Sequence, residues 1–282
     1  MRFATIVEGE RSSLAAVRGT RVLSLAMADD LPETMRELAA SGAVGLERVE
    51  AWVRRQPDLA YRLLDDVEIG PAVPDPGAIY AIGLNYAEPG EASAARPERP
   101  LVYAKLPTSV TGHGSTVTWD RALTNNVDPE VELGVVVGER AVAVAPGDAM
   151  RHVFGFTCVN DISSRDPWLD DDQWLLGKSM TGFCPVGPFV VTADEVSPSA
   201  LRLGCTINGV PIQDGYTGHM RHAVAEVISY LSHHTVLRPG DLVAMGTPAR
   251  LAGSLGPERH LQAGDRVTVW IEQIGALTTS IA

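Results

Sequence analysis

Hydrophobic positions follow two different spacings along the first 66 residues. Three short apolar runs, RFATIVEGE, SLAAVRG and TRVLSLA, are each bounded by glycine or charged residues, and they predict three short β-strands. From residue 31 to residue 66, apolar side chains such as Met35 and Val49 recur at roughly helical intervals. This stretch therefore predicts helical structure, interrupted only around Gly42–Gly45.

The pattern changes after a proline-rich segment, GPAVPDPG, at residues 70–77. Short β-branched runs now alternate with Gly/Pro turns and predict strands. These runs are AIYAIGL, VELGVVVG, VFGFTCV, GPFVVTADEV, LRLGCTING, DLVAMGT and DRVTVWIEQIG. One later helix is predicted at about residues 218–233, ending near LRPGD. We expect an α+β fold that is mainly β, with a small N-terminal domain at 1–70 and a larger domain at 78–282.

Composition and charge narrow the classes of function. The 282-residue chain is 45% hydrophobic, yet it has no 18-residue apolar run and no N-terminus like a signal peptide, so neither a membrane span nor export is expected. Its three cysteines are far apart and fit neither a disulfide framework nor a zinc ribbon. Reduced thiols favour a cytoplasmic location. A net charge of −12 without a basic cluster argues against binding to nucleic acid.

The segment VDPEVELGVVVG, at residues 127–138, carries the sharpest local signal. Because side chains alternate faces along a strand, Glu130 and Glu132 point the same way, with Cβ atoms about 6.5–7 Å apart. Two carboxylates in so apolar a strand repel each other and lose hydration. A hard cation with oxygen ligands removes both costs. The alternative is a strand with one solvated polar face, and this segment alone does not decide between the two.

Two later segments supply further candidate residues. VFGFTCVNDISSRD places Asp161 at the end of an apolar strand, where functional side chains often lie, although a helix cap or an Asx turn also explains an aspartate there. Arg165 and Asp166 are interpreted as a structural ion pair and turn. Lys178 precedes the apolar run FCPVGPFVV. Buried beside a metal, its ammonium would oppose the charge of an enolate; taken alone, it is interpreted as a surface lysine.

Seven segments in the same order resemble the fumarylacetoacetate hydrolase family, over about residues 78–282. They are IGLNY at 82–86, the Glu-Val-Glu at 130–132, VNDISSRD at 159–166, QWLLGKS at 173–179, FCPVGP at 183–188, INGVPIQDG at 207–215 and LRPGDLVAMGTP at 237–248. None is specific alone, because a Gly-Thr-Pro turn or a glutamate pair occurs in many proteins. Seven in register form a strong signal. Residues 1–70 resemble the small N-terminal domain that many members carry.

The resemblance implies a mixed β-roll core, usually in a homodimer, with Mg²⁺ at its centre (Mn²⁺ or Ca²⁺ in some members). Glu130, Glu132 and Asp161 match the shared carboxylate ligands of the metal in this family. Lys178 matches the active-site lysine. Substrate-contacting positions are matched by Thr247 of the Gly-Thr-Pro turn and, more weakly, by a tyrosine that precedes the family's lid: Tyr86.

Activities known in this family include hydrolysis of carbon–carbon bonds in acylpyruvates and 1,3-diketones, enol–keto tautomerisation, and decarboxylation or hydration of 2-oxo acids. In all of them, a metal chelates adjacent oxygens and stabilises an enolate. The resemblance therefore implies a small oxo-acid or dicarbonyl substrate.

The sequence departs from the family pattern at the lid. Family hydrolases usually place a histidine and a glutamate after the Asn-Tyr pair, and this dyad activates the attacking water. The two positions hold Pro89 and Ala92 here, with Glu91 one residue out of register, and Trp168 stands where a glutamine is usual. Three histidines are candidates for a replacement base: His113, His219 and His222.

These observations favour a divalent-metal-dependent hydrolase that cleaves a carbon–carbon bond in a 2-oxo acid or 1,3-dicarbonyl compound. The missing dyad gives nearly equal weight to a tautomerase or decarboxylase that needs only enolate stabilisation. A non-catalytic member retained for binding is the alternative of a different class, and the intact carboxylate and lysine positions argue against it. The chain has no Gly-x-Ser-x-Gly elbow and no glycine-rich dinucleotide turn.

Overall fold

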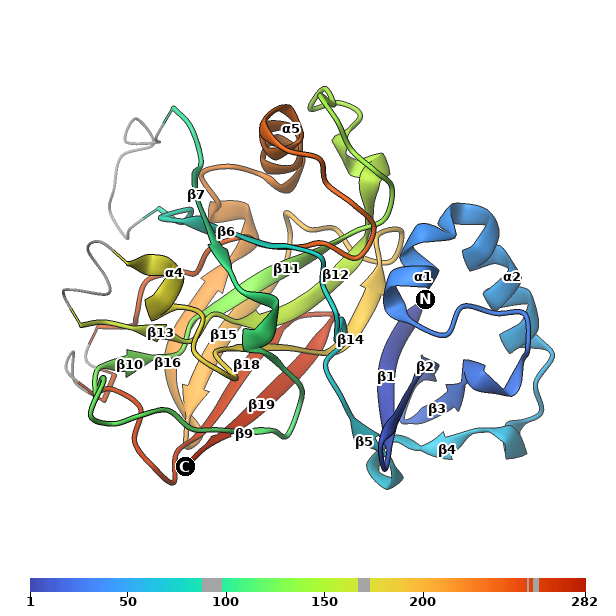
Figure 1. Cartoon of the computed structure of the whole chain (residues 1–282), viewed down its shortest axis with the longest axis horizontal. Helices are drawn as coiled ribbons and strands as arrows, with labels where there is room; N and C mark the ends of the chain where they lie inside the picture. Colours follow the sequence, from blue (N-terminus) through green and yellow to red (C-terminus); the bar gives the residue numbers. More distant parts are fainter. Residues whose placement is uncertain (88–97, 167–172, 253, 256–258) are drawn as a thin grey trace.

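The computed structural model describes residues 1–87, 98–166, 173–252, 254–255 and 259–282 (Figure 1). It is mainly β, as expected, with a twelve-stranded sheet, a five-stranded sheet and a two-stranded ladder. No helix in these ranges is long and apolar enough to cross a membrane.

The large sheet combines the N-terminal strands with strands from the later part of the chain. Its strands in spatial order are β4 (Arg62–Leu63), β3 (Arg21–Ser24), β2 (Arg11–Arg18), β1 (Arg2–Glu8), β14 (Cys184–Thr192), β12 (Val153–Asn160), β11 (Val131–Val137), β17 (Leu242–Ala244), β6 (Ile79–Gly83) and β7 (Leu101–Lys105), with β5 (Glu68–Ile69) beside β1 and β8 (Val110–Thr111) beside β14. The five-stranded sheet has the order β16 (Val210–Tyr216), β15 (Arg202–Ile207), β18 (Arg266–Ile271), β19 (Gly275–Ile281) and β9 (Thr116–Val117). The ladder pairs β10 (Val127–Asp128) with β13 (Ser163–Ser164).

Helices are short by comparison. The α-helices are α1 (Met35–Ala40), α2 (Gly42–Arg54), α4 (Trp174–Gly177) and α5 (Val224–His234). The 3₁₀ helices are η1 (Leu25–Met27), η2 (Asp58–Ala60), η3 (Leu64–Asp66), η5 (Pro107–Ser109), η6 (Ala149–His152) and η7 (Thr217–His219).

The predicted strands are all present, but both predicted helices need correction. In the stretch 31–66 the predicted interruption is confirmed, since Gly42 has a φ of +61° and separates α1 from α2. Helical structure ends at Arg54, however, and the remainder forms η2, β4 and η3. Thr34 and Glu37 close a capping box that starts α1. The later helix begins at Val224 rather than near residue 218, since a 3₁₀ turn occupies Thr217–His219.

The N-terminal strands join the large sheet edge to edge. β1 pairs antiparallel with β14, with Arg2 opposite Val191 and Phe3 opposite Val190. Phe3 and Val190 are also buried in one hydrophobic cluster. The helices α1 and α2 lie with β1–β4 on one side of the molecule (Figure 1). The domain boundary at 70–77 stays a prediction.

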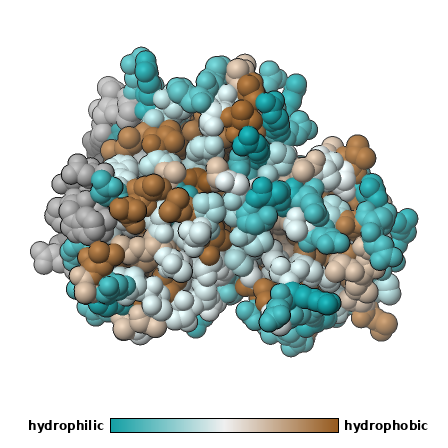
Figure 2. Space-filling view, in the orientation of Figure 1, coloured by the Kyte–Doolittle hydropathy of each residue, from teal (hydrophilic) through white to brown (hydrophobic). Residues whose placement is uncertain are grey.

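Strand β11 lies at the centre of the larger part of the molecule. It pairs with β12 on one side and β17 on the other, and every residue of β11 and β12 is buried. This explains why the two segments are almost entirely apolar, since both faces of the sheet are covered there. Exposed apolar side chains gather instead over β7 and α4, where Leu101, Leu175 and Leu176 are exposed (Figure 2).

Candidate metal centre

Glu130, Glu132 and Asp161 meet where β11 begins and β12 ends. The two strands are antiparallel with Val131 opposite Asn160, so the residue after β12 lies beside the residues that open β11. The Asp161 N–H donates to the Glu130 carbonyl oxygen at 2.9 Å. One carboxylate oxygen from each of the three lies within 4.8 Å of the others, and all three side chains are buried. This oxygen-only donor set fits a hard divalent cation, so the three carboxylates could hold one.

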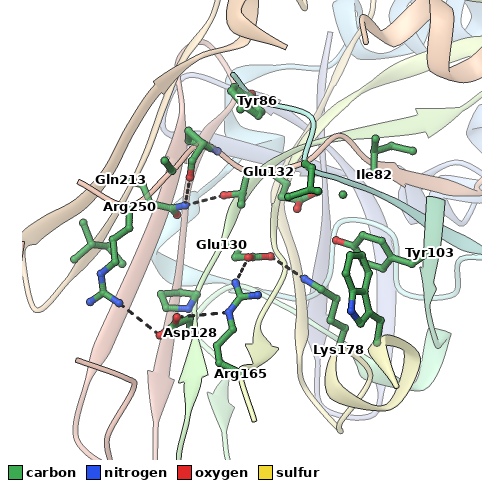
Figure 3. A pocket seen from close by; sticks show the side chains of 18 of the residues that line it. Ile82, Tyr86, Tyr103, Asp128, Glu130, Glu132, Arg165, Lys178, Gln213 and Arg250 are labelled. Atoms are coloured by element: carbon green, nitrogen blue, oxygen red, sulfur yellow. Dashed lines mark hydrogen bonds and ion pairs between the residues drawn. The ribbon is translucent and has the colours of Figure 1, made fainter. Parts of the chain in front are cut away.

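Lys178 follows α4 and points into this cluster (Figure 3). Its Nζ lies 2.9 Å from Glu130 Oε2, 3.0 Å from Asp161 Oδ2 and 2.6 Å from Ser163 Oγ. The surface-lysine interpretation is therefore wrong, because this side chain is buried. Arg165 also pairs with Glu130 and lies 3.6 Å from Asp128, so its ion pair belongs to the site.

Two residues of β7 that were not predicted from the sequence contact Asp161. Lys105 Nζ lies 2.5 Å from Asp161 Oδ1, and the Tyr103 hydroxyl donates to Asp161 Oδ2 at 2.6 Å. A compositional signal would have found the lysine, since the chain has 21 arginines and only two lysines, Lys105 and Lys178. Both lysines are buried against the same aspartate. No pattern in the sequence marks Tyr103.

The buried charges shift one another's protonation. Burial opposes ionisation of Asp161 and Glu130, yet the facing ammonium and guanidinium groups of Lys105, Lys178 and Arg165 hold the pKa of both carboxyls below its usual range. Burial and the negative charges of Asp161 and Glu130 raise the pKa of Glu132 well above its usual range. No ion pair of Glu132 is found among the described residues. A bound divalent cation would compensate the negative charge of the ionised Glu132 carboxylate.

The turn at Gly246 provides a hydrogen-bond donor to Glu132. The Gly246 N–H donates to Glu132 Oε2 at 2.7 Å. Gly246 has a φ of +87°, and a Cβ there would lie 2.7 Å from Asn85 Cβ, so only glycine fits. Asn85 in turn donates from Nδ2 to the Met245 carbonyl at 2.8 Å. These contacts bring the IGLNY and Gly-Thr-Pro segments together at the carboxylates.

A cavity of about 600 Å³ opens beside the cluster and is lined by Glu130, Glu132, Lys178, Tyr86 and Thr247 among others. The Tyr86 hydroxyl is buried and has no hydrogen-bond partner among the described residues. Burial, followed by the charge of Glu132, raises the pKa of Tyr86, so its hydroxyl stays protonated. Thr247 Oγ1 accepts a hydrogen bond from Gln213 Nε2 at 2.8 Å. The structure thus brings together all six residues that the sequence nominated.

The three candidate histidines do not line this cavity. His113 lines a separate cavity next to β5 and β8, and burial together with the charge of Arg266 lowers its pKa. His219 packs edge-on against Tyr216, and the backbone of His222 is hydrogen-bonded to Asn85. The lid positions and the substituted glutamine position, which are Pro89, Glu91, Ala92 and Trp168, lie outside the described residues.

Comparison with known proteins identifies the family. The model of the fumarylacetoacetate (FAA) hydrolase C-terminal domain matches residues 78–282. The chain belongs to the fumarylacetoacetate hydrolase family. An uncharacterised Staphylococcus aureus protein is 37% identical over 219 residues, which is 77% of this chain and 73% of that protein.

Two solved structures of this family cover the whole chain. A fumarylacetoacetate hydrolase from Exiguobacterium antarcticum matches 100% of this chain and 99% of its own, at a TM-score of 0.86 and 27% identity. A 2-hydroxyhepta-2,4-diene-1,7-dioate isomerase from Mycobacterium marinum matches 100% of this chain and 98% of its own, at a TM-score of 0.77 and 26% identity. Hydrolases and isomerases of the family therefore share this fold.

Proposed function

We propose that this member of the fumarylacetoacetate hydrolase family is a divalent-metal-dependent hydrolase that cleaves a carbon–carbon bond in a 2-oxo acid or 1,3-dicarbonyl substrate. The observation that carries the proposal is the buried cluster of Glu130, Glu132 and Asp161 beside a cavity that Lys178 also lines. The three carboxylates are proposed as the ligands of Mg²⁺, with Mn²⁺ or Ca²⁺ also suited to an all-oxygen site. We extend the proposal to a cytoplasmic homodimer, as the family resemblance implies.

Each nominated side chain has a role in this chemistry. A bound cation would act as a Lewis acid and as a template for two adjacent substrate oxygens. The negative charges of Asp161 and Glu130 outweigh burial and raise the pKa of Lys178, so Lys178 acts as a fixed cation opposite developing enolate charge and not as a base. The Tyr86 hydroxyl, which is buried without a hydrogen-bond partner among the described residues, is the proposed donor to a substrate oxygen. Thr247, which also lines the cavity, is the second proposed substrate contact.

Hydrolysis would form and break the following bonds. Water adds to the acyl carbonyl carbon, and the bond from that carbon to the carbon between the two carbonyls breaks. The bonding electron pair passes to the enolate of the departing 2-oxo acid, which is protonated at carbon. A carboxylic acid and a 2-oxo acid such as pyruvate result. Activation of the water requires a general base.

The lid favours a second candidate, an enol–keto tautomerase or decarboxylase of a 2-oxo acid. Pro89 and Ala92 stand at the positions of the usual His and Glu, and neither can accept a proton from water. Tautomerisation and decarboxylation need only a stabilised enolate, which the same carboxylates and lysine would provide. The Mycobacterium marinum relative with this fold is an isomerase.

A product screen tests the proposal against its alternatives. The Mg²⁺-loaded protein is incubated with acylpyruvates, oxaloacetate and an aryl 1,3-diketone, and the products are separated by mass. Formation of a carboxylic acid together with the second hydrolysis product, above the metal-only background, supports the hydrolase. Release of carbon dioxide without the carboxylic acid product of hydrolysis supports the decarboxylase, and deuterium uptake from D₂O without any bond cleavage supports the tautomerase. Binding with neither product formation nor proton exchange above the metal-only background would point to the non-catalytic alternative.

With Pro89 and Ala92 at the lid, hydrolysis of acetylpyruvate is expected to be slower than proton exchange at its central carbon. A general base contributes about 10²–10⁴ in rate, whereas a metal already acidifies the central C–H. A time course in D₂O follows deuterium uptake and pyruvate release together. Installing Pro89→His with Ala92→Glu should raise hydrolysis selectively. Rapid pyruvate release by the wild type would contradict the prediction and show that another base is present.

A further inference from the structure

The two lysines of this chain, Lys105 and Lys178, both lie beside Asp161. Basic positions are arginine 21 times and lysine twice. Both lysines are buried, and both contact Asp161. A lysine ammonium is a compact group with three donors, whereas a guanidinium is planar and carries five. Two positions that depart from the general use of arginine are therefore positions where the ammonium itself is needed.

Lys105 uses all three of its donors within the protein. Its Nζ donates to Asp161 Oδ1 at 2.5 Å, to the Ile162 carbonyl at 3.3 Å and to the Lys178 carbonyl. The side chain is fully excluded from solvent and is not among the residues that line the cavity. Lys105 therefore has neither a free donor nor a path to the substrate.

Lys178 differs in the nature of its acceptors. Its three partners are the side-chain oxygens of Glu130, Asp161 and Ser163, and it lines the cavity. A cation that took up the carboxylate oxygens would release donors of Lys178 toward a substrate. The two backbone carbonyls that hold Lys105 are not available to such a cation, so Lys105 stays in place.

Two side chains from one face of strand β7 donate hydrogen bonds to Asp161. Tyr103 and Lys105 are two residues apart and therefore point to the same side of the strand. Tyr103 donates to Asp161 Oδ2 and Lys105 to Oδ1, so both carboxylate oxygens are oriented by β7. The Lys105 ammonium also donates to the Lys178 carbonyl and so fixes the end of α4. From there the Lys178 side chain extends back over Tyr103, with its Nζ 4.9 Å from the centre of the ring.

We propose that Lys105 is the positioning residue of the site: one buried ammonium holds both Asp161 and the backbone of Lys178, so that the metal ligand and the cavity lysine keep their relative places. This inference rests on the proposed function, because it takes Asp161 as a ligand. Partners that orient a metal ligand typically contribute 10–100-fold to metal affinity or activity.

The first test compares Mn²⁺ affinity by titration calorimetry in the wild type and Lys105→Met, at a temperature where both are folded. Methionine keeps the length of the side chain and removes its three donors. We expect Mn²⁺ to bind about 10–100-fold more weakly to the variant. Asp241→Ala is the matched control: Asp241 is also buried and accepts two backbone N–H groups, but it lies at the opposite end of β17 from Gly246. It should lower the melting temperature and leave Mn²⁺ affinity unchanged.

A second test separates a donor role from space filling. Lys105→Ala removes the atoms that n-propylammonium contains, so adding this ion should restore Mn²⁺ affinity by about tenfold, whereas propan-1-ol should not. If the wild type binds Mn²⁺ and the Mn²⁺ affinity of Lys105→Met is within twofold of the wild-type value, the inference is overturned and the proposed function stays intact. Equal rescue by propan-1-ol would also overturn it. Absence of Mn²⁺ binding to the wild type would instead refute the proposed metal site itself.

Discussion

Replacing Glu132 with alanine is expected to abolish Mg²⁺ and Mn²⁺ binding while the protein stays folded. Glu132 lies within β11 and accepts a hydrogen bond from the Gly246 N–H, but it has no ion pair among the described residues, so its negative charge is available to a cation. Loss of a direct ligand should weaken binding by more than the roughly 10–100-fold that an orienting partner contributes. Removing a buried carboxylate that faces two others should keep or raise the melting temperature of the metal-free protein.

Titration calorimetry of both ions against wild type and Glu132→Ala measures this effect. Glu139→Ala is the matched control, because Glu139 is exposed beyond the far end of the same strand. It should bind both ions as the wild type does. Equal affinity in the wild type and Glu132→Ala would show that the ion binds elsewhere, and the assignment of the cluster would then fail.

Lys178→Met is expected to lower turnover by roughly 10²–10³, the usual loss when one electrostatic stabiliser of a transition state is removed. In the Mg²⁺-loaded protein the melting temperature should change by only a few degrees, because the ion compensates Glu130 and Asp161 in place of the ammonium. In the metal-free protein these carboxylates lose a buried partner, so the melting temperature should fall further.

Steady-state kinetics on the substrate found in the product screen, with thermal melts in Mg²⁺ and in chelator, check both parts. Ser179→Ala is a neighbouring control, since its hydroxyl accepts a hydrogen bond from the Leu106 N–H and does not line the cavity. A Lys178→Met protein with normal turnover per folded molecule and a much lower melting temperature in Mg²⁺ would make Lys178 structural.

The strands and the carboxylates could be predicted because their signals are local. β11 and β12 are buried on both faces, so their sequences are continuous apolar runs that stand out. Glu130 and Glu132 interrupt such a run at the spacing of one strand face, and Asp161 ends the next. Over 31–66 the helical spacing and the interruption near Gly42 were predicted correctly, but helical structure ends at Arg54 and the remainder forms 3₁₀ turns and the short strand β4.

The rest of the site could not be predicted because it depends on tertiary contacts. Two acceptors of Lys105 are main-chain carbonyls of segments more than fifty residues away, and a main-chain carbonyl carries no residue identity that a pattern can register. Tyr103 likewise gains its role only when β7 meets Asp161 after β12, and Arg165 only when it meets Glu130 and Asp128. Rarity of a residue type was the one sequence property that pointed to Lys105.

The pairing of β1 with β14 also bears on how this protein can be shortened. A chain cut to residues 78–282 would keep every predicted site residue, yet Val190 and Val191 would lose β1, their partner strand on the side away from β12. Unpaired backbone groups on an apolar strand are a template for pairing with another chain. The first seventy residues thus cover one edge of β14, and we expect a truncated form to aggregate more readily than the whole chain.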